Sequence, residues 1–159
     1  MKPVYCPEPI LARTLEIMQA AGSSKKERGV LWLANLAKPG IVVEAYEPVQ
    51  KTSRIRFWLP PQSMRMLMGH LRATRRMIVA QVHSHPARAF HSETDNNHAV
   101  VSHAGALSVV IPHFAKGVTA DNFTDVSKFF YLLPSGEWTE ASEKLIRTNF
   151  EIKSHERKN

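Results

Sequence analysis

Residues 83–95 of the chain read HSHPARAFHSETD. Two histidines, His83 and His85, stand one residue apart, Pro86 follows directly, and Asp95 lies ten residues after the second histidine. An H-x-H pair alone is a weak signal, because eight histidines among 159 residues would give about 0.4 such pairs by chance. The pair gains weight from its position at the end of MIVAQVHSH (77–85), an apolar segment that predicts a buried strand.

A strand would place both imidazoles on one side. Side chains two residues apart in a strand point to the same face, so His83 and His85 would project together while Ser84 points away. Two imidazoles held in this way can each offer one nitrogen to a single Zn²⁺ ion. Pro86 cannot extend a sheet ladder, so we expect the chain to leave the sheet there and to return on the next helix.

Asp95 fits the part of a third ligand on that helix, which we expect over residues 92–105. It lies three residues after Ser92, so the two side chains share one helix face. The same S-x-x-D pattern is typical of a capping box, with Ser92 as the N-cap and Asp95 near the positive helix end. The two interpretations do not exclude each other. Two histidines, one aspartate and a water form a ligand set of the catalytic zinc type.

The rest of the chain predicts helices and strands in alternation. Some neighbouring strands have connections short enough for hairpins. We therefore expect an α/β fold of the α+β type, with a mixed, mostly antiparallel, curved sheet flanked by helices. The expected helices span 8–21, 62–76, 92–105 and 141–152, and the expected strands span 29–36, 41–49, 54–59, 77–85 and 106–112, with a hairpin over 128–141.

Length and composition indicate one globular domain, over residues 1–152, followed by a basic tail over 153–159. No stretch approaches the roughly 20 apolar residues of a membrane span, so no membrane partner is expected. Prolines stand near the N-terminus where a signal peptide would need an apolar run, and the single Cys6 suggests a reducing compartment. We therefore expect a cytoplasmic location. The net charge of +7 lies in short clusters rather than in a stripe, which disfavours nucleic acid as the partner.

A zinc hydrolase also needs a carboxylate that takes a proton from the metal-bound water without binding the metal itself. Glu27, Glu44 and Glu47 precede or lie on predicted strands, and the pattern alone does not choose among them. Four further histidines near or after the motif are more typical of surface or hydrogen-bonded positions than of ligands; they are His91, His98, His103 and His113.

Together, H-S-H-P at 83–86 and S-x-x-D at 92–95 resemble the signature of the JAMM metalloproteases, the MPN+ domains. In that family a glutamate opens an early strand before a leucine-rich run, and ERGVLWLA (27–34) is similar to that segment. The order of the predicted elements also matches over most of residues 8–140. The resemblance implies a cytidine-deaminase-like MPN/JAMM fold.

The resemblance also implies the parts of the site. His83, His85 and Asp95 would bind one Zn²⁺ per chain, with water as the fourth ligand. Glu27 would be the general base, acting through the zinc-bound water, and Ser92 would help to stabilise the oxyanion of the tetrahedral intermediate. No covalent acyl-enzyme is needed, so Cys6 is not required as a nucleophile.

Proteolytic members of the family cut isopeptide or peptide bonds after the C-terminus of ubiquitin or a ubiquitin-like protein. Small bacterial members often accompany ubiquitin-activating-like and conjugating-like enzymes in defence operons, so these enzymes and a ubiquitin-like protein or its conjugates are the expected partners. An extended tail of such a substrate could bind as an added strand, for which TSRIRFWLP (52–60) is our candidate surface.

Two other interpretations stay open. One is a different hydrolase of the same fold, which processes a sulfur-carrier protein or cell-wall peptides. The other is a module that has lost catalysis, or one that binds nucleic acid through its positive charge. The complete set of one glutamate, two histidines, one serine and one aspartate argues against lost catalysis.

Overall fold

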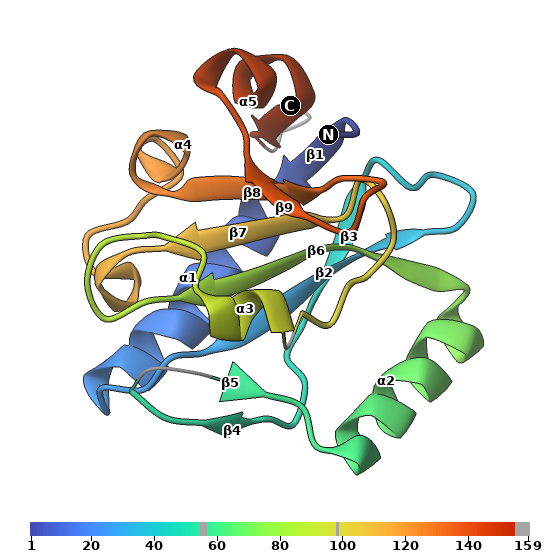
Figure 1. The fold of residues 1–159 in the computed structure, drawn as a ribbon, viewed down its shortest axis with the longest axis horizontal. Coiled ribbons are helices and arrows are strands. Elements are labelled where there is room, and N and C mark those ends of the chain that lie inside the picture. The colour runs from blue at the N-terminus through green and yellow to red at the C-terminus, as the bar shows by residue number, and fades with distance from the viewer. Residues whose placement is uncertain (55–56, 98, 155–159) are drawn as a thin grey trace, which may run out of the picture.

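The computed structural model describes residues 1–54, 57–97 and 99–154, which fold around one six-stranded sheet in the order β3-β2-β6-β7-β8-β9 (Figure 1). Strands β6 and β7 pair in parallel, and the other neighbours in the sheet are antiparallel. This confirms the mixed, mostly antiparallel sheet that the sequence predicts. The strands are β2 (Gly29–Asn35), β3 (Val42–Tyr46), β6 (Arg76–Ser84), β7 (Leu107–Ile111), β8 (Lys128–Leu132) and β9 (Trp138–Glu140).

Helices cover both faces of this sheet, with α1 (Glu8–Ser23) behind it and α3 (Glu93–Asn97) in front of it in Figure 1. Two further helices, α4 and α5, lie near β8 and β9. The remaining elements are α2 (Pro61–Thr74), α4 (Phe123–Val126), α5 (Glu143–Asn149), a 3₁₀ turn (His113–Ala115), β1 (Val4–Pro7) paired in parallel with β10 (Phe150–Lys153), and β4 (Lys51–Thr52) paired with β5 (Phe57–Trp58). No helix within the described ranges is long and apolar enough to cross a membrane.

Alternation along β2 divides the core between the two faces. Val30 and Trp32 are fully buried in the larger cluster, which α1 helps to form through Leu11 and Met18. Leu31 and Leu33 pack instead with Leu67 of α2 on the opposite face. The Trp32 Nε1–H donates to Thr14 Oγ1 at 2.9 Å, so even the polar edge of the largest core side chain has a partner. Because successive side chains of a strand point to opposite faces, the position of each residue along β2 decides which of the two clusters it joins.

Helix α3 is shorter than the helix predicted over residues 92–105, and it ends at Asn97. One reason is that the Val100 N–H donates to Gln81 Oε1 at 2.9 Å, so this backbone group does not continue a helix. The strand predicted over 54–59 is also wrong in extent. Of the described residues in that range, only Phe57 and Trp58 form a strand, and this strand pairs with β4 outside the main sheet; residues 55 and 56 lie outside the described ranges.

The closing helix predicted over 141–152 ends at Asn149, and the chain continues as β10. Phe150 explains the change, because its ring stacks on Trp32 at 6.0 Å between centroids and lies 5.0 Å from Phe129. Burying this side chain turns the backbone into a strand beside β1, which the sequence analysis missed. The division into a domain over 1–152 and a tail over 153–159 stays a prediction: Lys153 belongs to β10, and residues 155–159 lie outside the described part.

A left-handed turn follows β7. His113, Phe114 and Ala115 have φ angles of 53°, 52° and 62°, a conformation that costs non-glycine residues roughly 1–2 kcal/mol each. The Gln19 amide of α1 holds the turn by donating to the Ala115 carbonyl at 3.0 Å. Phe114 N–H in turn donates to the carbonyl of His85 at 2.8 Å. The turn therefore ties α1 to the backbone that leaves β6.

Gly22 makes this contact with α1 possible, and it supports a first prediction. A Cβ on Gly22 would lie 2.4 Å from Phe114 Cβ, whereas a Cβ on Gly69 of α2 would meet nothing within 4 Å. We expect Gly22→Ala to lower the free energy of unfolding by about 1–3 kcal/mol because it forces the two elements apart. Gly69→Ala, the matched control in a helix, should raise it by about 0.5–1 kcal/mol. Urea unfolding of both variants measures the difference, and equal effects would contradict the close approach.

Candidate metal centre

His83 lies near the end of β6 and His85 directly follows the strand; both are almost completely buried, with exposed fractions of 0% for His83 and 3% for His85. Their Nε2 atoms are 3.2 Å apart. Ser84 turns to a different partner, and its Oγ accepts a hydrogen bond from the Arg28 N–H at 3.2 Å. The strand thus projects both imidazoles together, and β2 on one side and β7 on the other hold the backbone that carries them.

Asp95 of α3 completes the group. Its Oδ1 lies 3.2 Å from His83 Nε2, and its Oδ2 lies 3.4 Å from His85 Nε2. One ligand atom from each of the three residues can be chosen so that all lie within 4.8 Å of one another. The parallel pairing of β6 and β7 explains this return, because the connection between parallel strands must cross the sheet rather than turn back as a hairpin.

The same aspartate also caps its helix. The Ser92 N–H donates to Asp95 Oδ2 at 2.7 Å, and the Ser92 hydroxyl donates to the same oxygen at 2.8 Å. In return, the Asp95 N–H donates to Ser92 Oγ at 3.1 Å. This reciprocal pattern is a capping box. Asp95 therefore both caps α3 and faces the two imidazoles, the two arrangements that the S-x-x-D pattern allowed.

The histidines keep Asp95 ionised. Burial alone would raise the pKa of its carboxyl, but hydrogen bonds from His83 and His85, the charge of His83 and the Ser92 N–H together lower that pKa well below its ordinary value. An ionised carboxylate beside two imidazole nitrogens is a donor set that suits a divalent cation. His83 Nδ1 is buried without a hydrogen-bond partner among the described residues, so the polar contacts of that imidazole are made through Nε2, while the Phe57 ring packs 5.5 Å away.

Glu27 lies two residues before β2 and is buried, with an exposed fraction of 2%. Gly29, two residues later, pairs with His83 across the ladder, which brings the glutamate toward the same end of β6. Its Oε2 has no hydrogen-bond partner among the described residues. Burial, and then the negative charge of Asp95, raise the pKa of Glu27 to about 8. A carboxyl with a raised pKa and a free oxygen beside a cation-binding group is suited to proton transfer.

The two alternative glutamates have other partners. Glu44 forms an ion pair with Arg76 and lies 3.1 Å from His70 Nε2, and Glu47 pairs with Arg28. Both carboxylates thus take part in ion pairs away from the two histidines of the H-x-H pair. Of the three candidates that the sequence left open, Glu27 is the one that the fold buries near the histidines.

Aromatic rings flank the two histidines. The Phe57 ring lies 5.5 Å from that of His83, and it packs so closely over β2 that a Cβ on Gly29 would be 2.3 Å from its Cε2 atom. Phe90 meets His85 edge-on at 4.7 Å and is 47% exposed. These apolar walls shield the polar group from water, which strengthens electrostatic interactions inside the site.

Residues that the sequence analysis did not assign to the site surround α3. Burial lowers the pKa of His91 below its ordinary value, which favours the neutral ring, and its two nitrogens lie 2.6 Å from Asn96 Oδ1 and 3.0 Å from Ser108 Oγ. One signal in the sequence could have indicated these residues. Gln81 and Ser108 are polar residues that each lie inside an apolar strand segment. His113 lies in the left-handed turn and His103 is exposed, whereas His98 lies outside the described residues.

Cys6 has no part in the group. It lies in β1 with no exposed surface, and burial raises the pKa of its thiol to about 12. A thiol in this state is a poor nucleophile.

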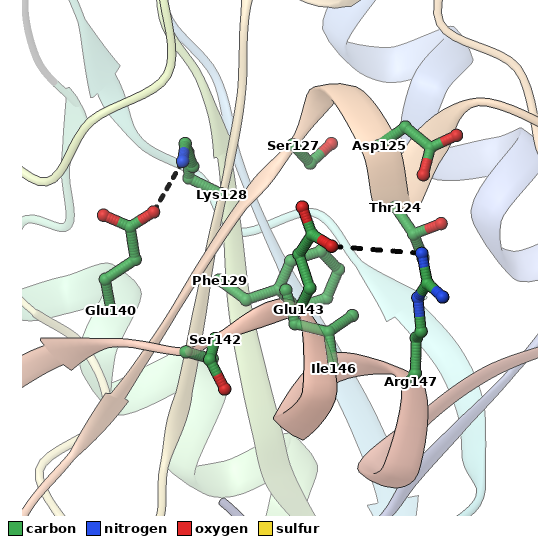
Figure 2. Close-up of a pocket in the computed structure, with 11 residues that line it drawn as sticks. Thr124, Asp125, Ser127, Lys128, Phe129, Glu140, Ser142, Glu143, Ile146 and Arg147 are labelled. Atoms are coloured by element: carbon green, nitrogen blue, oxygen red, sulfur yellow. Dashed lines mark hydrogen bonds and ion pairs between the residues drawn. The ribbon is translucent and has the colours of Figure 1, made fainter.

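A separate cavity of about 330 Å³ lies between α4, β8, β9 and α5, and Figure 2 shows its lining. Two ion pairs cross its walls, Lys128–Glu140 at 2.6 Å and Arg147–Glu143 at 3.9 Å. Its lining includes neither the histidines of the H-x-H pair nor the two carboxylates near them. This cavity is thus separate from the candidate metal centre.

The comparison with known proteins agrees with this arrangement. Residues 15–127 match the family described as prokaryotic homologs of the JAB domain. A protein named "Probable metalloprotease y4jG", from Sinorhizobium fredii (strain NBRC 101917 / NGR234), is 28% identical over 121 residues, which cover 73% of this chain and 75% of that protein.

A solved structure shows the same fold. The solution structure of a Desulfitobacterium hafniense protein is similar with a TM-score of 0.64 at 16% identity, over 96% of this chain and 94% of that one. A JAB1/MPN domain protein from Archaeoglobus fulgidus gives a TM-score of 0.49 at 14% identity, over 98% of this chain and all of the other. Because the family match spans more than two thirds of the sequence, the chain belongs to the prokaryotic homologs of the JAB domain, the metalloprotease-like JAMM/MPN family that its H-S-H-P and S-x-x-D motifs resemble.

Proposed function

We propose that this protein is a zinc-dependent isopeptidase or peptidase that cleaves after the C-terminus of a ubiquitin-like protein. The observation that carries the proposal is the convergence of His83, His85 and Asp95, with a buried Glu27 at the same end of β6. The relative named as a probable metalloprotease supports the reaction class. The ubiquitin-like substrate is the finer part of the proposal, and it rests on the resemblance of the motif.

Zinc is the ion that suits these residues best. Three protein ligands of histidine and carboxylate type leave one position open for water, as catalytic zinc sites do, and the set has no thiolate that would favour a closed structural site. A zinc ion bound there would lower the pKa of its water to about 7 and polarise the carbonyl of the scissile bond.

Glu27 would carry the proton. Its free Oε2 would accept a proton from the attacking water while the water oxygen bonds to the carbonyl carbon. The same oxygen would then deliver that proton to the amine nitrogen as the carbon–nitrogen bond breaks. The reaction consumes one water, needs no covalent acyl-enzyme, and so agrees with the inert interior position of Cys6.

Ser92 would stabilise the oxyanion. Its hydroxyl donates at present to Asp95 Oδ2, so this role requires the hydroxyl hydrogen to turn from the carboxylate to the substrate oxygen. A hydroxyl can rotate in this way without moving the helix that it caps.

The substrate tail would add as a strand beside β5. Phe57 of this strand contacts His83, so a chain bound along β5 would pass the metal centre. The candidate surface over 52–60 includes residues 55 and 56, which lie outside the described ranges. Ubiquitin-activating-like and conjugating-like enzymes would be further partners in a bacterial defence system, and the lone buried Cys6 agrees with work in the reducing cytoplasm.

Zinc content tests the metal site. We expect one equivalent of zinc per chain in the wild type and a loss of zinc in His85→Ala, because two remaining ligands hold the ion weakly. His103→Ala, which changes an exposed histidine, is the control and should keep its zinc. Metal analysis after dialysis against excess zinc provides the readout. Unchanged zinc content in His85→Ala would remove this residue from the proposed ligands.

Cleavage tests the reaction and its substrate. The probes are ubiquitin-like proteins that end in two glycines and carry a short peptide extension, compared with an unstructured peptide of the same junction. We expect cleavage of the folded probe after the second glycine, and a loss of at least about 100-fold in Glu27→Gln, which removes the general base but not the metal.

Two controls make the result interpretable. Glu47→Gln changes a surface ion pair and should leave the rate close to the wild-type value. Glu27→Gln must still hold one zinc. Cleavage of the unstructured peptide alone would favour the other hydrolase classes, and an active Glu27→Gln would overturn the role of Glu27.

A further inference from the structure

We propose that four polar side chains, His91, Asn96, Ser108 and Gln81, form a positioning network that holds α3 against the sheet and thereby sets the place of Asp95. We call them the α3 network. The inference rests on the proposed metal site, because it assigns a purpose to residues that surround Asp95 without being ligands.

One part of the network is centred on His91, which precedes α3 in the chain. The two nitrogens of His91 lie 2.6 Å from Asn96 Oδ1 and 3.0 Å from Ser108 Oγ, so this ring joins the helix to β7. The ring packs against Phe130 at 4.8 Å and Trp138 at 5.0 Å between centroids. With both nitrogens in use, His91 has no lone pair left for a metal ion.

The other part of the network is centred on Gln81, which links β7 to the chain that follows α3. Gln81 Nε2 donates to Ser108 Oγ at 3.2 Å, and the two residues are register partners in β6 and β7. Gln81 Oε1 accepts from the Val100 N–H at 2.9 Å. His91 stands two residues before α3 and Val100 three residues after it, so the network fixes the chain on both sides of the helix.

One set of hydrogen positions satisfies the whole network. The Val100 N–H donates to Gln81, the Gln81 amide donates to Ser108, the Ser108 hydroxyl donates to His91 Nε2, and His91 Nδ1–H donates to Asn96. All four bonds run in the same direction and end on α3. A complete network of this kind specifies one arrangement, whereas a partly satisfied network would not.

Stability alone does not explain these residues. Gln81 is 2% exposed and Ser108 is fully buried, and apolar residues precede and follow each of them in its strand. Apolar side chains of similar shape at such positions are often neutral or stabilising. Helix α3, by contrast, has five residues, which is far too short to hold a fixed place by itself. The position of Asp95 therefore depends on these anchors.

His91→Phe is the decisive variant. Phenylalanine keeps the aromatic packing against Phe130 and Trp138 but breaks the link from β7 to α3. We expect the zinc dissociation constant to rise by about 10- to 100-fold, the usual effect of losing a partner that orients a ligand. We expect the thermal midpoint of the metal-free protein to change by no more than about 4 °C.

Thr14→Val is the matched control. It removes a buried hydrogen bond between Thr14 and Trp32 on the other face of the sheet, away from α3. This variant should lower the thermal midpoint and leave the zinc dissociation constant unchanged. A merely structural role of His91 would produce the pattern of Thr14→Val instead.

Hydrogen exchange tests the inference without metal. In the metal-free protein, the Asn96 amide, which donates to the Ser92 carbonyl at 3.0 Å, and the Val100 amide should exchange at least about 10-fold faster in His91→Phe than in the wild type. The Val82 amide inside β6 should not change. Wild-type protein that binds no zinc would overturn the proposed metal site, whereas tight zinc binding and unchanged exchange in His91→Phe would overturn the α3 network alone.

Discussion

The parallel pairing of β6 with β7 is the constraint on which the metal centre depends. Two antiparallel strands could be joined by a tight turn, but the chain that leaves β6 after His85 must cross the face of the sheet before it can enter β7. That crossing carries α3, and with it Asp95, back to the imidazoles of His83 and His85. The antiparallel neighbour β2 brings Glu27 to the same end of the strand. One choice of strand direction thus assembles side chains from three separate parts of the sequence.

Electrostatics explains why the group of His83, His85 and Asp95 suits a cation. Glu27 is buried and the Asp95 side chain is only 7% exposed, and the negative charge of Asp95 raises the cost of ionising Glu27. The imidazoles stabilise the Asp95 carboxylate, whereas Glu27 Oε2 has no partner among the described residues. A divalent ion between the histidines and Asp95 would offset this buried negative charge, and the aromatic rings of Phe57 and Phe90 would strengthen the attraction by keeping water away.

Local patterns in the sequence were enough for the parts that depend on neighbouring residues. The apolar segment 29–36 predicted the strand β2, and H-x-H at the end of an apolar strand predicted two imidazoles on one side. Long-range partners decided what was missed. Strands β1 and β10 have four residues each and exist because they pair across almost the whole chain. The end of α3 depends on Gln81, and the left-handed turn at 113–115 contains no glycine to reveal it and depends on Gln19 of α1. These contacts join residues that are far apart in the chain, so a local sequence pattern cannot reveal them.

Anomalous diffraction from a crystal grown with excess zinc tests the metal centre most directly. Data collected on both sides of the zinc absorption edge would locate the ion independently of the protein atoms. We expect one strong peak per chain, about 2.0–2.2 Å from His83 Nε2, His85 Nε2 and a carboxylate oxygen of Asp95. No peak at this position, with the three side chains turned away from one another, would contradict the metal centre and the hydrolase that is built on it.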